Sequence, residues 1–352
     1  MKYLPDSTQT AYSSLLQKLQ DSRYALLGKI GFNKKVKNGI TNWYCQYTDI
    51  SGKRKQRFIG AESDATEALK ASIVSSQQAS ERILAERQRM VAMVSAGGAT
   101  VEKGRPAKII QKLSDAGVFD LGGILIGSYA FSTYGNMLGV IFDESMRRTE
   151  DMDLAYDTSI EIGFVSNIRE DIQEADPEMV EPKQINPWVP PYEMMAPDGF
   201  KIEFLTSRKH PQDKAPVPIE RFDVNAQPLE FLDYLMKETT EAAVIYNAGV
   251  LVNVPHPARF ALHKLAVSQL REPGNTEKRA KDIKQATALI EYYLEESPGA
   301  LILASDDART RGDMLHAFIE MGIKSMKNLD IASKFESLWN AASPIEPFKM
   351  TS

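Results

Sequence analysis

The sequence predicts a mixed α/β protein, and three observations support this fold class. The apolar segment LGGILIG, residues 121–127, is typical of a buried strand and is followed at once by a helical pattern. Alternating segments meet at two turn signals, Ser51 with Gly52 and Ala196 to Gly199, which indicates two β-hairpins. From about residue 229 the pattern becomes mainly helical, so the chain combines sheet and helix.

The N-terminal region, residues 1–98, is predicted to be a small α+β domain of helix-hairpin-helix type. Apolar side chains at helical spacing predict a helix over 7–27, and residues 31–39 are expected to form a loop. A hairpin of basic and aromatic strands follows, and then one long helix from residue 64 to about 95. The segment SAGGAT, residues 95–100, is expected to be the linker that closes this domain.

Residues 105–228 are predicted to form an α/β domain, and residues 229–352 a mainly helical one. In the first of these we expect helices over 105–117 and 129–138, a strand within 147–156, and a hairpin whose strands are WVPPYEMM and FKIEFLT. The last region is predicted to contain one hairpin, AAVIYNAGVLVNVP, and then four helices, over 257–271, 276–296, 307–322 and 328–341.

Composition excludes several classes of protein. With 352 residues and 43% hydrophobic content, the chain has enough apolar material for ordinary cores. It contains no apolar run long enough to span a membrane and no signal-peptide pattern, so we expect a cytoplasmic protein that does not bind membranes. The single cysteine, Cys45, excludes an internal disulfide, and the four histidines lack the spacing of zinc ligands.

The net charge of −5 hides a basic block near the N-terminus. Residues 29–58 carry eight Lys and Arg against one Asp, so the block is +7 and the rest of the chain is −12. A basic block in an acidic chain indicates a polyanionic partner.

Two aspartates are placed on one face of the strand RRTEDMDLAY, residues 147–156. Side chains alternate along a strand, so Asp151 and Asp153 share one face while Met152 and Leu154 share the other. Carboxylates held about 6 to 7 Å apart repel each other unless a cation lies between them, and Mg²⁺ favours such oxygen ligands. The pair is therefore interpreted as a metal site, although a solvated strand end or a helix cap would produce the same pattern.

The order of motifs resembles the nucleotidyltransferase superfamily of the DNA polymerase β type. That superfamily has a Gly-Ser turn between a strand and a helix, an acid-x-acid pair on the next strand, and a third acid on a later strand. Gly127 and Ser128, then Asp151 and Asp153, then Glu203 occur in that order. The resemblance covers roughly residues 105–290 and predicts a polymerase-β-like core.

A shorter motif resembles the abortive-infection and toxin branch of that superfamily. Its R-x-S/T-x-D-h-D signature is similar to the run from Arg147 through Thr149 to Asp153. One departure is that 22 residues separate Ser128 from Asp151, so residues 139–146 are expected to be an inserted loop.

The resemblance implies roles for these residues. Gly127 and Ser128 would contact the nucleotide phosphates, since the N-terminus of a helix attracts anions, and Arg147 and Thr149 would also bind the nucleotide. Asp151, Asp153 and Glu203 would hold two Mg²⁺ ions, and Glu203 would also accept a proton from the attacking hydroxyl. Asp157 and Asp198 are the available substitutes for Glu203, which would otherwise be an outward residue of an edge strand.

A later helix supplies candidate phosphate ligands. Lys264 and Arg271 are seven residues apart and so share a helix face, and the resemblance implies that they meet the triphosphate. Lys278, Arg279 and Lys281 would extend this basic wall, with Asp282 orienting one of the cations. The alternative is an ordinary solvated amphipathic helix. His256 and His263 are interpreted as hydrogen-bonded packing residues.

The basic block contains a second candidate site. Lys53, Arg54, Lys55 and Arg57 alternate with aromatic residues, and cations together with exposed rings suit RNA or single-stranded nucleic acid. The competing interpretation is that the rings form a small core and the cations keep an edge strand soluble. The aromatic residues concerned are Trp43, Tyr44, Tyr47 and Phe58.

The function predicted is transfer of a nucleoside monophosphate from an NTP to a hydroxyl, with loss of pyrophosphate. RNA, and tRNA in particular, is the expected acceptor, and an antitoxin partner would accompany a toxin-type enzyme. Two alternatives stay open: a transferase acting on a small molecule or on a protein, and a non-catalytic nucleic-acid-binding protein that retains the fold.

Overall fold

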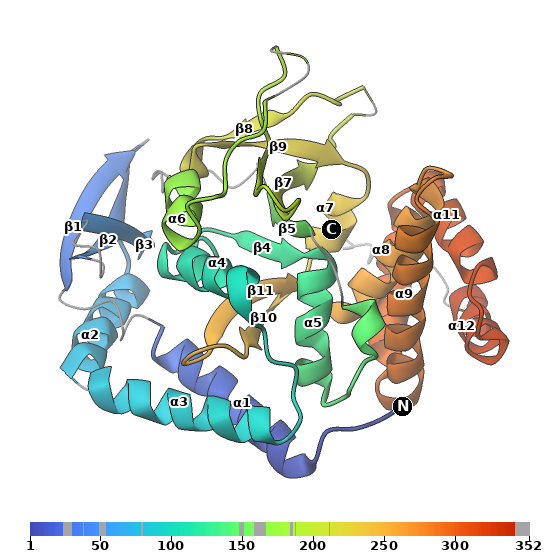
Figure 1. Cartoon of the computed structure of the whole chain (residues 1–352), viewed down its shortest axis with the longest axis horizontal. Coiled ribbons are helices and arrows are strands. Elements are labelled where there is room, and N and C mark those ends of the chain that lie inside the picture. The colour runs from blue at the N-terminus through green and yellow to red at the C-terminus, as the bar shows by residue number, and fades with distance from the viewer. Residues whose placement is uncertain are drawn as a thin grey trace, which may run out of the picture.

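The structure is a computed structural model in which helices pack around one main sheet and two smaller ones (Figure 1). None of the helices it describes is both long and apolar enough to cross a membrane. The described residues are 1–23, 30–37, 39–48, 54–78, 80–147, 151–157, 167–183, 186, 188–210 and 212–341.

The N-terminal region has a three-stranded sheet where the sequence predicted a two-stranded hairpin. Strand β1 (Ile30–Lys37) pairs antiparallel with β2 (Ile40–Thr48), which pairs with β3 (Arg54–Ala61). The expected loop over 31–39 was wrong because Ile30 and Phe32 pack against the core around Cys45 and Tyr47. The flanking helices are α1 (Asp6–Asp21), α2 (Asp64–Gln78) and α3 (Ser80–Ala96).

Helices α2 and α3 replace the single long helix that was predicted. They run in different directions, with α2 beside the small sheet and α3 beneath the molecule alongside α1 (Figure 1). Leu15 and Leu19 of α1 share a core with Val94 of α3 and with Ala243. Because Ala243 belongs to the hairpin near residue 250, this core joins the first predicted domain to the third.

The main sheet has the strand order β4-β5-β7-β9-β8. Strand β5 runs antiparallel to β4 and parallel to β7, and β7 runs parallel to β9. The predicted hairpin at the 196–199 turn forms, since β6 pairs antiparallel with β7. The strands are β4 (Gly123–Ile126), β5 (Asp151–Tyr156), β6 (Glu193–Met195), β7 (Lys201–Ser207), β8 (Val217–Ile219) and β9 (Val224–Leu229).

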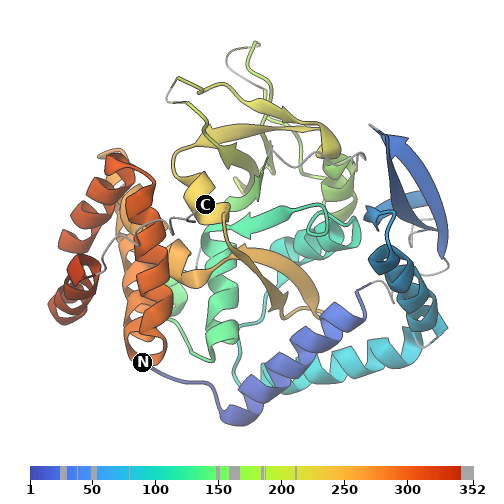
Figure 2. The same cartoon turned by 180° about the vertical axis from the view of Figure 1, so that it is seen from behind.

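Helices and a second hairpin surround this sheet. The hairpin of β10 (Thr239–Val244) and β11 (Val250–Pro255) lies between β4 and α1, as views from both sides show (Figure 2). It was predicted, whereas β8, β9, α6 and α7 were not. The helices here are α4 (Gly104–Asp115), α5 (Gly127–Leu138), α6 (Ile168–Ala175) and α7 (Leu232–Met236), with short 3₁₀ turns at Glu144–Met146 and Glu220–Phe222.

The C-terminal region is helical, as predicted, but the helix expected over 307–322 is two helices. The break falls at Gly312, whose φ of +107° lies outside the helical region. Helix α8 is central and is buried on nearly every side, so it is not the solvated amphipathic helix offered as an alternative. The helices are α8 (Pro257–Leu270), α9 (Thr276–Glu296), α10 (Pro298–Thr310), α11 (Asp313–Lys324) and α12 (Leu329–Ala341).

Candidate active site

The turn from β4 into α5 brings a glycine against a carboxylate. Gly127 begins α5 with φ of +63°, a left-handed conformation that favours glycine. Ile126 is in register with Asp153 on the neighbouring strand, and a Cβ added at Gly127 would clash with Asp153 Oδ2. The first backbone N–H groups of α5, whose N-cap Ile126 makes no side-chain cap bond, therefore lie beside Asp153.

The predicted acids meet on one face of the sheet. In the parallel β5–β7 ladder, Asp153 is opposite Glu203 and Asp151 is opposite Lys201. Aligned residues of neighbouring strands project to the same face. Three carboxylates and one ammonium group therefore lie next to one another as two adjacent cross-strand pairs. Lys201 Nζ lies 3.0 Å from Glu203 Oε2. Although burial lowers the pKa of Lys201, the charges of Glu203 and Asp151 raise it above its ordinary value, so the side chain is cationic.

Asp153 is the most perturbed acid of this group. Burial, and next the negative charge of Glu203, raise the pKa of Asp153 to about 6, while Lys264 acts in the opposite direction. Asp151 is placed differently, because its Oδ2 lies 2.6 Å from Lys278 Nζ on α9. The carboxylates of the acid face therefore meet lysines from two directions, Lys201 of the sheet and Lys278 of α9.

Helix α8 faces these acids with two cations held by one buried aspartate. Lys264 Nζ lies 2.6 Å from Asp282 Oδ1, and Arg271 Nε lies 2.9 Å from Asp282 Oδ2. Although burial raises it, the charges of Lys264 and Arg271 and their hydrogen bonds hold the pKa of Asp282 below its ordinary value. Asp282, only 1% exposed, therefore orients both cations rather than one.

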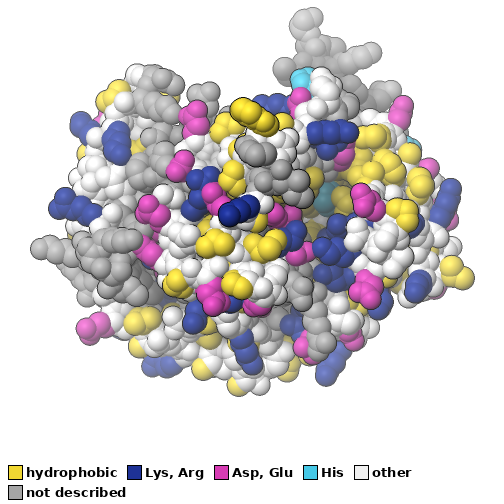
Figure 3. All heavy atoms as spheres, turned by 45° about the horizontal axis from the view of Figure 1, so that its top comes forward, with side chains coloured by type: hydrophobic (Ala, Val, Ile, Leu, Met, Phe, Trp, Pro, Cys, Tyr) yellow, Lys and Arg dark blue, Asp and Glu magenta, His cyan; other side chains and the backbone are white. Residues whose placement is uncertain are grey.

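One cavity of about 590 Å³ joins these groups. Asp153 and Glu203 line it together with Lys264 and Arg271, the ion pair of Arg208 with Glu230, and a set of apolar side chains, whereas Asp151 and Lys201 are not part of its lining. Figure 3, which brings the top of the molecule forward, shows Lys and Arg side chains around a hollow that has a hydrophobic patch on one side. The polar lining includes Gly127, Asp153, Glu203, His263, Lys264 and Arg271, and the apolar lining includes Leu229, Leu232, Leu235, Phe260, Val267 and Leu270.

Comparison with known proteins identifies the family. Residues 105–310 match the model of a family described as Nucleotidyltransferase. The chain belongs to this family. A crystal structure of an antigenic nucleotidyltransferase-like protein from Paracoccidioides brasiliensis is similar at 16% identity, over 61% of this chain and 90% of that one. Its TM-score of 0.30 is too low to establish a common fold. No curated protein matches the chain.

The fit of this nucleotidyltransferase to divalent cations is partial. Asp153 and Glu203 offer carboxylate oxygens, the ligands that Mg²⁺ prefers, in the lining of the cavity. However, no three His, Cys, Asp or Glu side chains in the described part of the chain are placed to hold one ion. Asp151 pairs instead with Lys278, and Glu203 pairs with Lys201.

Sequence reasoning missed a fourth acid in the nucleotidyltransferase. Glu193 of β6 is directly opposite Glu203 in the hairpin register, so it shares the acid face. Burial, and among the neighbouring charges that of Glu203, raise the pKa of Glu193 above its ordinary value. Counting outward from the predicted turn at Ala196 to Gly199 would have placed Glu193 opposite Ile202, because the Ala196 backbone N–H bonds to the Phe200 carbonyl and shifts the observed register by one residue.

The two histidines of α8 differ in their surroundings. His256 is a structural N-cap, as predicted, since its Nδ1 accepts a hydrogen bond from the Ala258 backbone N–H at 3.3 Å. His263 was expected to be hydrogen-bonded, but neither of its ring nitrogens has a partner among the described residues. Burial, assisted by the charge of Lys264, lowers the pKa of His263 to about 3, so the ring is neutral.

The remaining predicted nucleotide ligands lie outside the cavity lining or outside the described residues. Ser128 is buried in the first turn of α5, directly after Gly127. Arg147 ends the short 3₁₀ turn before β5, and its buried Nε has no partner among the described residues. Thr149 falls in the segment that the structure does not describe.

The basic hairpin is partly a structural core. Arg57 is 5% exposed and pairs with Asp120, so it is not available to an external phosphate. Tyr44 and Tyr47 are buried, and Tyr47 donates a hydrogen bond to the Asp115 carbonyl. Arg54 is exposed, while Lys53 and the side chain of Lys55 lie outside the described residues. For the two tyrosines the core interpretation is therefore correct.

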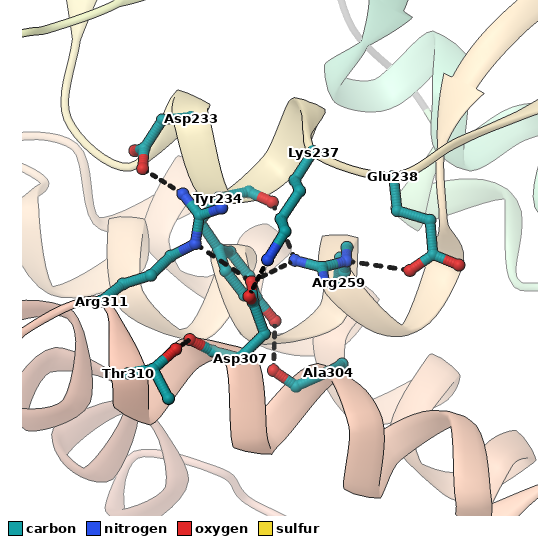
Figure 4. Close-up of polar contacts among 9 residues, drawn as sticks. All are labelled: Asp233, Tyr234, Lys237, Glu238, Arg259, Ala304, Asp307, Thr310 and Arg311. Carbon is teal, nitrogen blue, oxygen red and sulfur yellow. Dashed lines mark hydrogen bonds and ion pairs between the residues drawn. The ribbon is translucent and has the colours of Figure 1, made fainter. Parts of the chain in front are cut away.

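A charged junction fixes the apolar wall of the cavity. Asp307 of α10 accepts from Arg259 Nη1 at 2.7 Å and from Arg311 Nε at 3.0 Å, and it also pairs with Lys237 (Figure 4). Tyr234 of α7 donates a hydrogen bond to the Ala304 carbonyl at 3.0 Å. The junction therefore ties α7, which carries Leu232 and Leu235 into the cavity, to α8 and α10.

Replacing Asp307 by Asn is expected to lower the free energy of unfolding by about 2 kcal/mol at pH 7. Although burial raises it, the hydrogen bonds from Lys237 and Arg259 hold the pKa of Asp307 at about 2. A lowered pKa stabilises the fold above the ordinary value, and this stabilisation is lost as the pH falls through the folded value. The difference between the two proteins should therefore shrink between about pH 4 and pH 2 in urea titrations.

The matched control is Asp330→Asn, which removes an exposed partner of Lys334 on α12. It should cost clearly less than Asp307→Asn, because water screens an exposed ion pair. Equal losses in the two variants would show that the junction contributes no more than a surface ion pair.

Proposed function

We propose that this protein transfers a nucleoside monophosphate from an NTP to a hydroxyl acceptor and releases pyrophosphate, with Mg²⁺ as cofactor. The observation that carries the proposal is the cavity itself. Its lining combines Gly127 at the start of α5, two carboxylates of the sheet, the two cations held by Asp282, and an apolar surface. A nucleoside triphosphate has the same division into a charged, cation-binding part and an apolar base.

The residues of the chain would divide the work as follows. Backbone N–H groups at the start of α5 bind phosphate oxygens, and Gly127 allows their close approach. Lys264 and Arg271, held in place by Asp282, neutralise charge on the leaving pyrophosphate. Glu203 accepts the proton of the attacking hydroxyl as the new bond to the α phosphorus forms. Mg²⁺ held by Asp151 and Asp153 would supply further charge stabilisation.

RNA is the acceptor that we favour, and tRNA is the RNA that we favour most. The role that we propose with a tRNA acceptor is that of a toxin-type enzyme, which an antitoxin partner would inhibit. Support comes from Lys34, Lys35 and Arg54, which are exposed on the N-terminal sheet. Lys34 Nζ lies 5.7 Å from the Trp43 ring centroid, so cationic and aromatic groups adjoin there. The burial of Arg57 weakens this support, and a small hydroxylated molecule is therefore the second candidate.

The test is to incubate the protein with each α-³²P-labelled NTP, Mg²⁺ and total RNA, and to compare it with Asp153→Asn. Label on RNA that is absent with the variant is the expected result, because Asp153 lies between the helix N-terminus and Glu203. Label on a small molecule or a protein would keep the chemistry and change the acceptor. Absence of label with every nucleotide and acceptor would favour a nucleic-acid-binding protein that retains the fold.

A further inference from the structure

The acid face of the sheet already contains a cation that belongs to the chain. Four carboxylates share this face, those of Asp151, Asp153, Glu203 and Glu193. Lys201 lies among them, opposite Asp151 in the β5–β7 ladder and two residues before Glu203 on the same strand. Strand alternation therefore fixes the ammonium on the face where a divalent cation would bind.

The two lysines at this face differ in how firmly they are held. Lys278 projects from α9, its side chain is 50% exposed, and it reaches Asp151 from outside the sheet. It can leave the carboxylate for water at small cost. Lys201 comes from the centre of the sheet, its side chain is 23% exposed, and its Nζ lies 3.0 Å from Glu203 Oε2. An incoming cation can displace the Lys278 side chain into water. The Lys201 side chain stays on the acid face, because its place in the β5–β7 ladder determines the side of the sheet from which it projects.

We propose that Lys201 takes the place of one of the two divalent cations that the family resemblance predicts, so that the site binds a single ion. This inference rests on the proposed nucleotidyl transfer. The single ion binds at Asp151 and Asp153 together with the triphosphate. Glu203 stays paired with Lys201, which agrees with the lack of a three-ligand group among the described His, Cys, Asp and Glu residues.

The pair of Lys201 and Glu203 can perform the task of the missing ion. A second ion would stabilise the oxyanion that develops on the attacking hydroxyl. Here the Lys201 ammonium would supply that positive charge, and the Glu203 carboxylate would accept the proton. The bond from oxygen to the α phosphorus forms, the bond from that phosphorus to the bridging oxygen breaks, and pyrophosphate leaves with the electron pair.

The experiment counts Mn²⁺ ions per bound nucleotide. The protein is saturated with Mn²⁺ and with the α,β-methylene analogues of the four NTPs in turn, and bound metal and nucleotide are measured after ultrafiltration. We expect one Mn²⁺ per bound analogue for the wild type, two for Lys201→Gln, and one for Lys201→Arg, which keeps the charge. Lys324→Gln, at an exposed position on α11, is the control and should bind one.

Each outcome decides the inference. Two ions on the wild type would overturn it, and so would one ion on Lys201→Gln, provided that this variant melts cooperatively and binds the analogue. Wild-type protein that labels an acceptor and binds two ions would leave the proposed function intact while the inference fails. Wild-type protein that binds one Mn²⁺ per analogue but labels no acceptor would contradict the proposed function, while the inference of a single bound ion would stand.

Discussion

Replacing Asp153 by Asn is expected to abolish nucleotidyl transfer and to make the metal-free protein more stable. The carboxylate is needed for the cation and the triphosphate, so the rate should fall at least about a thousandfold. Without a bound cation the same carboxylate is buried beside Glu203, and its pKa is raised to about 6. Removing the charge at pH 7 should raise the free energy of unfolding by about 1 to 2 kcal/mol.

The stability of the wild type and of the Asp153→Asn variant should depend differently on pH. An acid whose pKa is higher in the folded state binds its proton more tightly there, so the wild type should lose stability as the pH rises from about 4 to about 6. The Asn variant should lack this loss, as thermal melts in chelator would show. Asp157→Asn, at the end of the same strand, is the control and should retain activity. A less stable Asp153→Asn protein at pH 7 would contradict the electrostatic account.

Replacing Gly127 by Ala is expected to lower activity at least about a hundredfold. The left-handed backbone at φ of +63° costs an alanine about 1 kcal/mol, and the new methyl would collide with the Asp153 carboxylate. Either the Asp153 carboxylate or the first turn of α5 must then shift. The proposed phosphate site at the start of α5 would move away from the proposed cation site at Asp153. Steady-state kinetics and a urea titration would measure both effects.

The other end of the same helix provides a matched control. Gly139 ends α5 with φ of +69°, so Gly139→Ala carries the same backbone strain. Its added methyl would meet the side chain of Gln9, whose Nε2 donates to the Leu4 carbonyl and which does not line the cavity. We expect a loss of about 1 kcal/mol in stability and unchanged kinetics. Equal losses of activity in the two variants would show that strain in α5, rather than the contact with Asp153, is responsible.

The acid site was predicted from local sequence patterns. Such patterns predict which face of a strand a residue occupies, but not which strands pair with each other. Alternation placed Asp151 and Asp153 on one face, and the glycine turn followed from LGGILIG and the helix after it. The same rules missed β8, which has only three residues, and also β1 and β9, whose polar or proline-containing sequences resemble loops; such strands are recognised only through the partners they pair with. The break between α10 and α11 was missed for a related reason, since one glycine is a weak signal in an otherwise helical pattern.

The sequence by itself determined the mixed α/β class, the glycine-serine turn, the acid pair and the two cations seven residues apart, Lys264 on α8 and Arg271 at its C-cap. These are properties of neighbouring residues, and the period of a strand or helix fixes them. Only the tertiary structure decided that Lys201 stands opposite Asp151, that Asp282 holds both Lys264 and Arg271, and that Arg57 is turned inward to Asp120. Register and packing between distant segments make those contacts, because the free energy that selects them comes from burial shared by the whole fold.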